Sequence, residues 1–187
     1  MNIRTILTLL CLCTTVALFA QDKINYHTGY KVEWKDFKGK VPKATSFHAL
    51  TNSGISFATS TTDAGDSLEI QVLCYFDKTQ SWTKKDKQKP ILLDHERLHW
   101  DITEVYARQL RQALAKSDYR VDELNTELGK LFQKYVSEQD KRQELYDHET
   151  DHSKVEEEQK RWQEEIAAEL ESLSAWADPA IRIALKR

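Results

Sequence analysis

The sequence predicts an α+β fold, in which a small and mostly antiparallel sheet is followed by a helical half. Residues 26–76 are rich in Thr, Ser, Val, Ile and aromatic residues, a composition that favours strands. From residue 90 onward the chain is rich in Leu, Ala, Glu, Gln, Lys and Arg, which favour helices. The spacing of apolar residues also changes between the two parts, from alternation to steps of three and four.

The first half contains the pattern of a β-hairpin. Apolar and polar residues alternate over Gly54–Ser60 and over Ser67–Phe76, and turn-forming residues lie between them at 63–66. We expect a further strand near Tyr30–Trp34. The stretch Trp34–Gly39 then predicts a turn that is anchored by its aromatic residues.

Three helices are expected in the second half. Pro90 can open the first, since proline suits the first helical position. Ser153 and Glu156 have the spacing of a capping box, which predicts that the third helix starts at Ser153. The apolar stripes that define the helices are Leu92, His95, His99, Ile102, Tyr106 and Leu110, then Val121, Leu124, Leu128, Leu131 and Tyr135, and last Val155, Trp162, Ile166 and Leu170.

The two ends of the chain differ in their predicted roles. A basic start is followed by an uncharged apolar run, Thr5–Ala20, that is short for a membrane span, so residues 1–20 predict a secretory signal peptide. An uncleaved anchor is the alternative. At the other end Pro179 stops any helix, and Ile181, Ile183 and Leu185 alternate with other residues. Residues 176–187 are therefore expected to form a tail or an edge strand.

Removal of the signal peptide would change the length, the cysteine content and the charge of the chain. Residues 21–187 suit a single domain, with strands mainly in 21–89 and helices mainly in 90–175. Removal of the signal would also remove two of the three cysteines and leave Cys74 without an internal disulfide partner. The formal charge would go from −3 to −4 with the loss of Arg4, which gives no reason to expect a nucleic-acid partner. No membrane span is expected in the mature chain, and the predicted location is secreted or periplasmic.

The sequence HERLH, His95 to His99, has the H-E-x-x-H pattern of a zincin-like helix. At about 100° per residue the two histidines lie roughly 40° apart on a helix, so both imidazoles can reach one ion. Glu96 falls about 60° beyond His99, where a carboxylate can take a proton from water without ligating the metal. The alternative is a pair of hydrogen-bonded core histidines that match the pattern by chance.

A second match, HETDH, covers His148 to His152 and lies among charged residues. If Ser153 caps a helix, His148 and His152 both precede it, and an independent zinc-binding helix is excluded. His152 can still face inward, because it stands three residues before the stripe that begins at Val155. A catalytic zinc needs a third protein ligand, for which four histidines and many carboxylates remain. A solvated His152 is the other interpretation.

Several stretches resemble an uncharacterised bacterial family of predicted secreted zinc-dependent proteases. They are residues 93–104 around HERLH, the following Ala107 and Arg108, the stretch from Tyr146 to His152, residues 159–162, and more weakly residues 34–37 and 49–51. The fixed positions that the family shows in its second motif fall here on Tyr146, Asp147, Thr150 and His152, while His148 falls on a variable one. Ser153 stands where the family commonly has glycine.

The resemblance implies one site built from both motifs. His95, His99 and His152 would hold Zn²⁺, with Asp147 as the alternative third ligand or as a partner that orients an imidazole. Tyr146 would either donate a hydrogen bond to an oxyanion or pack in the core, and the second role is favoured.

The expected function is that of a secreted zinc-dependent metallopeptidase. Zinc would polarise the scissile carbonyl of a peptide or protein substrate, and Glu96 would act as general base. The exposed edge of the hairpin sheet could align an extended peptide by strand addition. One alternative is a non-catalytic envelope protein with a structural zinc site or with no metal. Another is a helical interaction module that uses the Glu-rich third helix, whose charges more simply predict a solvated face.

Overall fold

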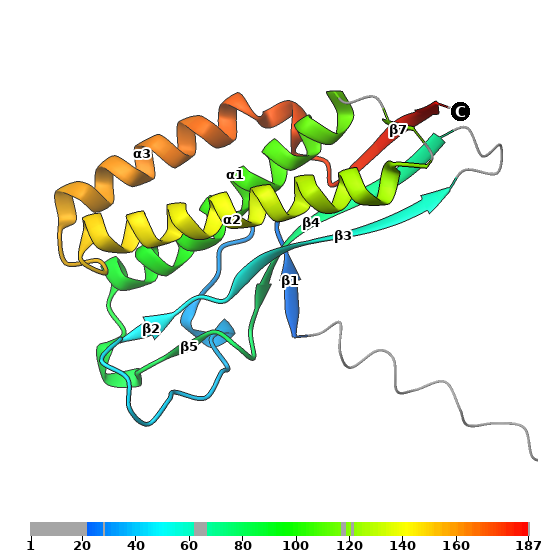
Figure 1. Cartoon of the computed structure of the whole chain (residues 1–187). Helices are drawn as coiled ribbons and strands as arrows, with labels where there is room; N and C mark the ends of the chain where they lie inside the picture. The colour runs from blue at the N-terminus through cyan, green and yellow to red at the C-terminus, as the bar shows by residue number, and fades with distance from the viewer. Residues whose placement is uncertain (1–21, 28, 62–66, 117–118, 121, 187) are drawn as a thin grey trace, which may run out of the picture.

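The computed structural model describes residues 22–27, 29–61, 67–116, 119–120 and 122–186. It shows a mixed α+β fold in which three helices cover one face of a twisted sheet (Figure 1). The expected signal peptide and the expected hairpin turn lie outside the described residues. The helices are α1 (Pro90–Lys116), α2 (Leu124–Thr150) and α3 (Glu156–Ser172).

The larger sheet is organised around β4 (Ser67–Asp77). β3 (Ser53–Thr61) pairs with it antiparallel from Ser53 opposite Phe76 to Thr61 opposite Leu68, which confirms the hairpin. The other side of β4 pairs antiparallel with β1 (Lys23–Asn25) at one end and with β7 (Ala180–Lys186) at the other. β6 (Tyr119–Arg120) is parallel to the end of β7, and β2 (Ala49–Leu50) pairs with β5 (Trp82–Thr83) in a second, two-stranded sheet.

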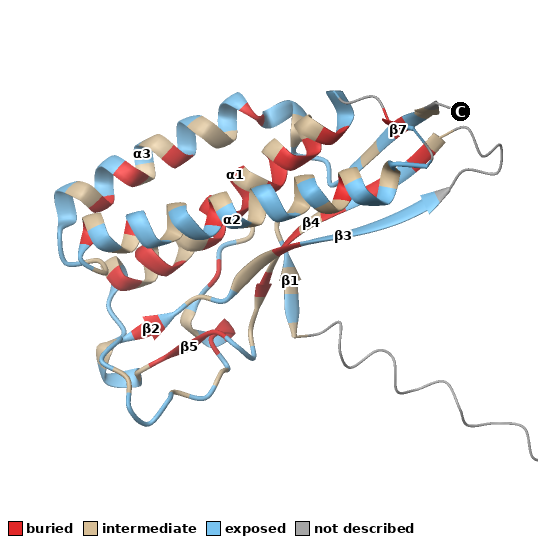
Figure 2. Cartoon of the chain, in the orientation of Figure 1, coloured by how far each residue is buried: buried red, intermediate tan, exposed pale blue. Residues whose placement is uncertain are grey.

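The strand pattern explains which face is covered. Leu68, Ile70, Val72, Cys74 and Phe76 alternate along β4 and are all buried, because they face the helices. Figure 2 shows the buried residues running along α1, which lies between the sheet and the other two helices. α1 is therefore covered on several sides.

Two expectations about the elements are wrong, and the strand expected in the tail is present. Residues 30–33 form no strand, because the carbonyl of Val32 accepts a hydrogen bond from the Arg97 side chain at 2.7 Å rather than from a neighbouring strand. The tail forms β7, which adds to the sheet by pairing with β4, and β6 pairs with its last two residues. The third helix begins at Glu156, and its stripe does not include Val155, which is 40 % exposed.

The Trp34–Gly39 turn is present and contains a short 3-10 helix, Trp34–Asp36. Phe37 packs edge-on against Phe76 of β4, which provides the aromatic anchor. A second 3-10 turn, Lys85–Lys87, precedes α1, and a third, Ser174–Trp176, follows α3. Across the described ranges, no helix combines the length and the apolar character that a membrane crossing requires.

A buried ionic cluster ties α1 to the sheet and to the end of α3. Glu104 accepts hydrogen bonds from Arg108 and Arg111, both at 2.9 Å, and all three side chains are at most 6 % exposed. Arg111 also donates to the carbonyls of Val72 in β4 and Trp176, and Arg108 donates to the carbonyl of Leu170. The guanidinium groups thus satisfy backbone carbonyls from three other elements while Glu104 neutralises part of their charge.

We expect Glu104→Gln to lower the free energy of unfolding by about 3–5 kcal/mol, since removing one partner of a buried ion pair leaves uncompensated charge. Urea denaturation followed by circular dichroism measures the loss. Glu69→Gln is the matched control, because Glu69 pairs with Arg182 on the exposed face of the sheet. That variant should lose no more than about 1 kcal/mol. Equal losses of unfolding free energy in the two variants would show that the buried cluster stabilises the protein no more than the exposed pair does.

Candidate metal centre

The HERLH segment lies in the second turn of α1 and faces the end of α2. His95 is 2 % exposed and His99 is 12 % exposed at the side chain, so both imidazoles are largely withdrawn from water. Their Nε2 atoms are 3.2 Å apart. The helix therefore brings the two rings to one point, as the i, i+4 spacing predicts.

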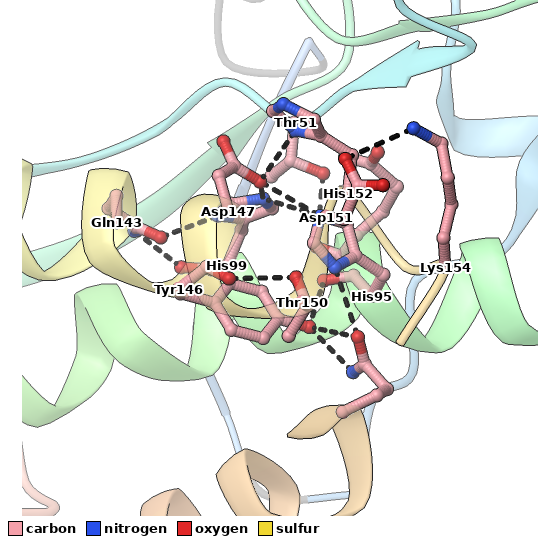
Figure 3. A network of polar contacts seen from close by, with 12 residues as sticks. Thr51, His95, His99, Gln143, Tyr146, Asp147, Thr150, Asp151, His152 and Lys154 are labelled. Carbon is pink, nitrogen blue, oxygen red and sulfur yellow. Dashed lines mark hydrogen bonds and ion pairs between the residues drawn. The ribbon is translucent and has the colours of Figure 1, made fainter. Parts of the chain in front are cut away.

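The second motif contributes from the last turn of α2 and from the turn that follows. Asp147 lies in the helix, and His152 lies just beyond its end at Thr150. Asp147 Oδ1 is 3.0 Å from His95 Nε2, 3.2 Å from His99 Nε2 and 3.2 Å from His152 Nδ1 (Figure 3). His148 is exposed on the helix and has no contact with this group of atoms among the described interactions.

The backbone that presents His152 is unusual. Asp151, His152 and Ser153 all have positive φ values, 44°, 52° and 76°, although none is glycine. The His152 amide donates to the carbonyl of Asp147, and the Val155 amide donates to that of Thr150. This left-handed turn excludes Ser153 as a helix N-cap, because an N-cap residue normally adopts the extended region. The expected capping box is therefore wrong.

Two glutamines fix which nitrogen of each buried imidazole faces the site. Gln143 donates its amide N–H to the carbonyl of His99 at 2.8 Å, so its Oε1 is the atom that accepts from His99 Nδ1 at 2.6 Å. Gln159 Oε1 lies 3.0 Å from Nδ1 of His95 and accepts from it in the same way. With a proton on Nδ1, a ring directs its Nε2 atom at the site, where that atom can bind a metal ion or, when it carries a proton as well, donate to Asp147.

The short contacts between the imidazoles and Asp147 shift the pKa values of both Asp147 and His99. Burial alone would raise the pKa of the Asp147 carboxyl, but hydrogen bonds from His95 and His99 hold that pKa far below its usual range. Burial lowers the pKa of His99, yet the hydrogen bond to Asp147 and the negative charge of Asp147 and Glu96 outweigh it, and the pKa is raised. Both shifts have the same cause, the short contacts between the imidazole nitrogens and the carboxylate.

Glu96 lies beside the two histidines and is 3 % exposed. Its backbone carbonyl accepts a hydrogen bond from Thr51 at 3.0 Å, but its Oε2 is buried and has no hydrogen-bond partner among the described residues. A buried carboxylate oxygen without a partner is costly, so this atom calls for a proton donor such as a water molecule. The residue lines the same cleft as the histidines.

Tyr146 is fully buried behind the cluster. Its ring stacks on that of His95 with centroids 4.5 Å apart, and its hydroxyl hydrogen-bonds with Gln159 at 2.8 Å. Burial raises the pKa of the phenol. Tyr146 does not line the cleft and supports the His95 ring from behind, which agrees with packing rather than with contact to an oxyanion.

The cluster opens into a cleft of about 440 Å³. One wall is the segment from Ser46 to Thr51, which includes β2, and the floor is formed by α1. His152 and Lys154, together with Gln143 and Asp147 of α2, complete the lining. A small molecule or an extended peptide therefore has access to the point where the three histidines and Asp147 meet.

The donor set fits a first-row metal ion. Two ligands about 2.0–2.1 Å from a tetrahedral zinc ion lie roughly 3.3 Å from each other. The separations of 3.0–3.2 Å among His95 Nε2, His99 Nε2 and Asp147 Oδ1 are close to that value. His95, Asp147 and His152 also form a triad of ligand atoms that all lie within 4.8 Å of one another. These residues thus suit the zinc ion that the sequence implies.

Sequence reasoning named four of the side chains that meet here but missed the two glutamines. Gln143 stands four residues before Asp147, one helical turn away on the same face of α2. Extending α2 through Asp147 would have revealed it. Gln159 lies inside one of the stretches on which the family resemblance rests, but its role required the fold.

Comparison with known proteins gives one partial match. A family model for bacterial proteins of unknown function, DUF922, matches residues 75–153. The matched region starts near the end of β4 and includes the whole of α1, α2 and the left-handed turn, so it contains every candidate ligand. No curated protein and no solved structure matches the chain. The chain is therefore similar, over its metal-centre region, to a bacterial family whose function is unknown.

Proposed function

We propose that this protein is an exported zinc-dependent metallopeptidase whose metal is held by His95, His99 and the second motif. The spacing of 3.0–3.2 Å among two imidazole nitrogens and the Asp147 carboxylate is the observation that carries the proposal. Acceptor atoms at these distances repel one another unless a proton or a metal cation lies between them. Either Asp147 or His152 could be the third ligand, because both lie beside the imidazole of His95.

Zinc, when bound, supplies a Lewis acid that polarises a carbonyl and makes water more acidic. The residues of the chain supply the rest of the chemistry. Glu96, with its unpartnered Oε2 beside the cluster, receives the proton of the attacking water and passes it to the leaving amine. Gln143 and Gln159 hold the Nδ1 protons of the two imidazoles and thereby keep both Nε2 atoms directed at the site.

β2 offers an edge along which an extended substrate can bind. The amide of Lys84, the residue after β5, donates to the carbonyl of His48 at 2.8 Å, and Ala49 stands opposite Thr83. Because backbone groups alternate sides along an antiparallel strand, the N–H and C=O of Ala49 point away from β5. The same segment lines the cleft. Strand addition is therefore proposed at β2, next to the metal centre, rather than along the hairpin.

Metal analysis and a peptidase assay together test the proposal. Protein purified without chelators should contain close to one zinc per chain by plasma mass spectrometry. The zinc-loaded protein should cleave peptides from a broad library, and removal of the metal with a chelator should abolish cleavage. A protein that binds no zinc, or a zinc-loaded protein that cleaves nothing, would contradict the peptidase assignment.

Gln143→Leu is expected to weaken zinc binding by about 10–100-fold, the usual effect of removing an outer partner of a ligating histidine. The reason is that His99 loses the acceptor that fixes its ring and its proton. Gln139→Leu is the control. Gln139 is one turn earlier on the same face of α2 and is buried, but it approaches Thr103 instead of a histidine. Competition with a chromogenic chelator measures both affinities, and equal affinities would contradict the role of Gln143.

A non-catalytic zinc site is the second candidate, and one observation favours it. Three imidazoles each lie within 3.2 Å of Asp147 Oδ1, so four potential ligands are gathered around this carboxylate, and structural zinc sites typically use four protein ligands. The accessible cleft and the unpartnered Glu96 carboxylate favour catalysis instead.

Export is proposed from the N-terminal sequence, with the mature protein in the periplasm or outside the cell and with no nucleic acid as partner. The mass of the exported chain tests this, since it should lack residues 1–20.

A further inference from the structure

One wall of the cleft is apolar and open to solvent. Five large hydrophobic side chains are exposed among the described residues, and two of them, Phe47 and Leu50, lie in the β2 segment that lines the cleft. Phe47 is 47 % exposed and Leu50 is 39 % exposed. The buried side chain of Leu92 from α1 lies on the same lining. Exposed apolar side chains gathered at a cleft indicate a binding surface.

The apolar wall formed by Phe47 and Leu50 adjoins the metal centre, because the Phe47 ring contacts the His152 ring. Phe47 packs edge-on against His152 with ring centroids 5.0 Å apart, and Nδ1 of His152 is 3.2 Å from Asp147. An extended chain advances about 3.3 Å per residue. A substrate side chain that touches Phe47 therefore belongs to a residue at the scissile bond or next to it.

The charges of the cleft also restrict what can occupy this wall. The carboxylates that line the cleft in the described part of the chain are those of Glu96 and Asp147, and both belong to the metal centre. Lys154 also lines the cleft, and its ammonium group is already paired with Asp151 at 3.1 Å. A basic substrate side chain would thus find the apolar side chains of Phe47 and Leu50 and no carboxylate in the lining outside the metal centre, so its desolvation would be unfavourable.

We propose that Phe47 and Leu50 determine specificity, so that the cleft selects peptides with a bulky apolar side chain beside the scissile bond and disfavours lysine or arginine there. The inference rests on the proposed function, because it assigns the substrate class of the same site. Apolar pockets commonly discriminate by about 10–200-fold between side chains that differ in size.

Peptide hydroxamates test the proposal without requiring turnover, because the hydroxamate group chelates the metal. N-acetylated Phe, Leu, Gly and Lys hydroxamates are titrated calorimetrically into the zinc-loaded protein. The Phe and Leu compounds should bind at least about tenfold more tightly than the Gly compound, and the Lys compound no more tightly than Gly. In Phe47→Ala and Leu50→Ala the ratio of Phe to Gly affinity should fall to about threefold or less.

Leu145→Ala is the matched control. Leu145 is 45 % exposed on α2 and does not line the cleft, so its removal should leave the ratio unchanged. Equal affinities of the Phe and Gly compounds in the wild type would overturn the specificity proposal and leave the zinc site standing. Tighter binding of the Lys compound would overturn it as well. Failure of every hydroxamate to bind zinc-loaded protein would overturn both this proposal and the proposed function.

Discussion

Replacing Glu96 by glutamine is expected to leave zinc content unchanged and to lower peptidase activity by about two to four powers of ten. Glutamine keeps nearly the same shape but cannot accept the proton of the attacking water. The Glu96 carboxylate is not among the atoms that surround Asp147 Oδ1, so the ligand set stays complete. Initial rates on a peptide library and metal analysis of the same preparation measure both quantities.

Asp94→Asn provides the control for Glu96→Gln. Asp94 precedes His95 directly on α1, but its carboxylate pairs with Arg97 at 2.9 Å and does not line the metal cleft. The control should retain full activity. A Glu96→Gln variant that cleaves peptides as fast as the wild type would refute the general-base role. Unchanged biological activity in that variant, with zinc retained, would favour a structural site.

Alanine substitutions of the candidate ligands should separate the two histidines of the second motif. We expect His99→Ala and His152→Ala to weaken zinc binding to a similar extent, and each by more than the 10–100-fold typical of outer partners. Asp147→Ala should have an effect of the same order, because its Oδ1 is the atom that all three imidazoles approach. His148→Ala should change affinity little, since His148 is exposed and turned away.

Competition titrations with a chelator of known affinity measure the series, and thermal unfolding of the metal-free variants checks that each still folds. Loss of binding in His148→Ala together with normal binding in His152→Ala would reverse the choice between the paired histidines. Loss in Asp147→Ala alone, with His152→Ala unaffected, would identify Asp147 as the third ligand and place His152 outside the metal shell.

The sequence predicted the elements whose signals are local. The alternation along Ser67–Phe76 and the stripe from Leu92 to Leu110 depend on neighbours a few residues apart, and both elements are present. The start of the third helix depended on a capping box at Ser153. It failed because a serine does not reveal a positive φ, which only the glycine common at this position in the resembling family would have indicated.

Only part of the candidate site was predicted, because the rest depends on contacts between helices. His95 and His99 follow from the spacing of one helix, but the position of Asp147 among them depends on how α2 crosses α1. Gln143, Tyr146 and Asp147 form a polar and aromatic stripe at i, i+3 and i+4 on α2. An apolar periodicity does not detect such a stripe, so the second half of α2 and its role in the site could not be read from hydrophobicity.

The left-handed turn makes the region around His152 less stable against local unfolding than the rest of the domain. Three consecutive non-glycine residues in this conformation cost about 1–2 kcal/mol each, and the cost is offset by a few backbone hydrogen bonds and by the contacts of His152 with Asp147 and Phe47. His95 and His99, in contrast, belong to a long helix at the centre of the fold. The turn can therefore open by local unfolding while the cores on both sides of α1 stay intact. If the proposed metal binds here, its release and recapture would require only the opening and closing of these few residues and not the unfolding of the domain.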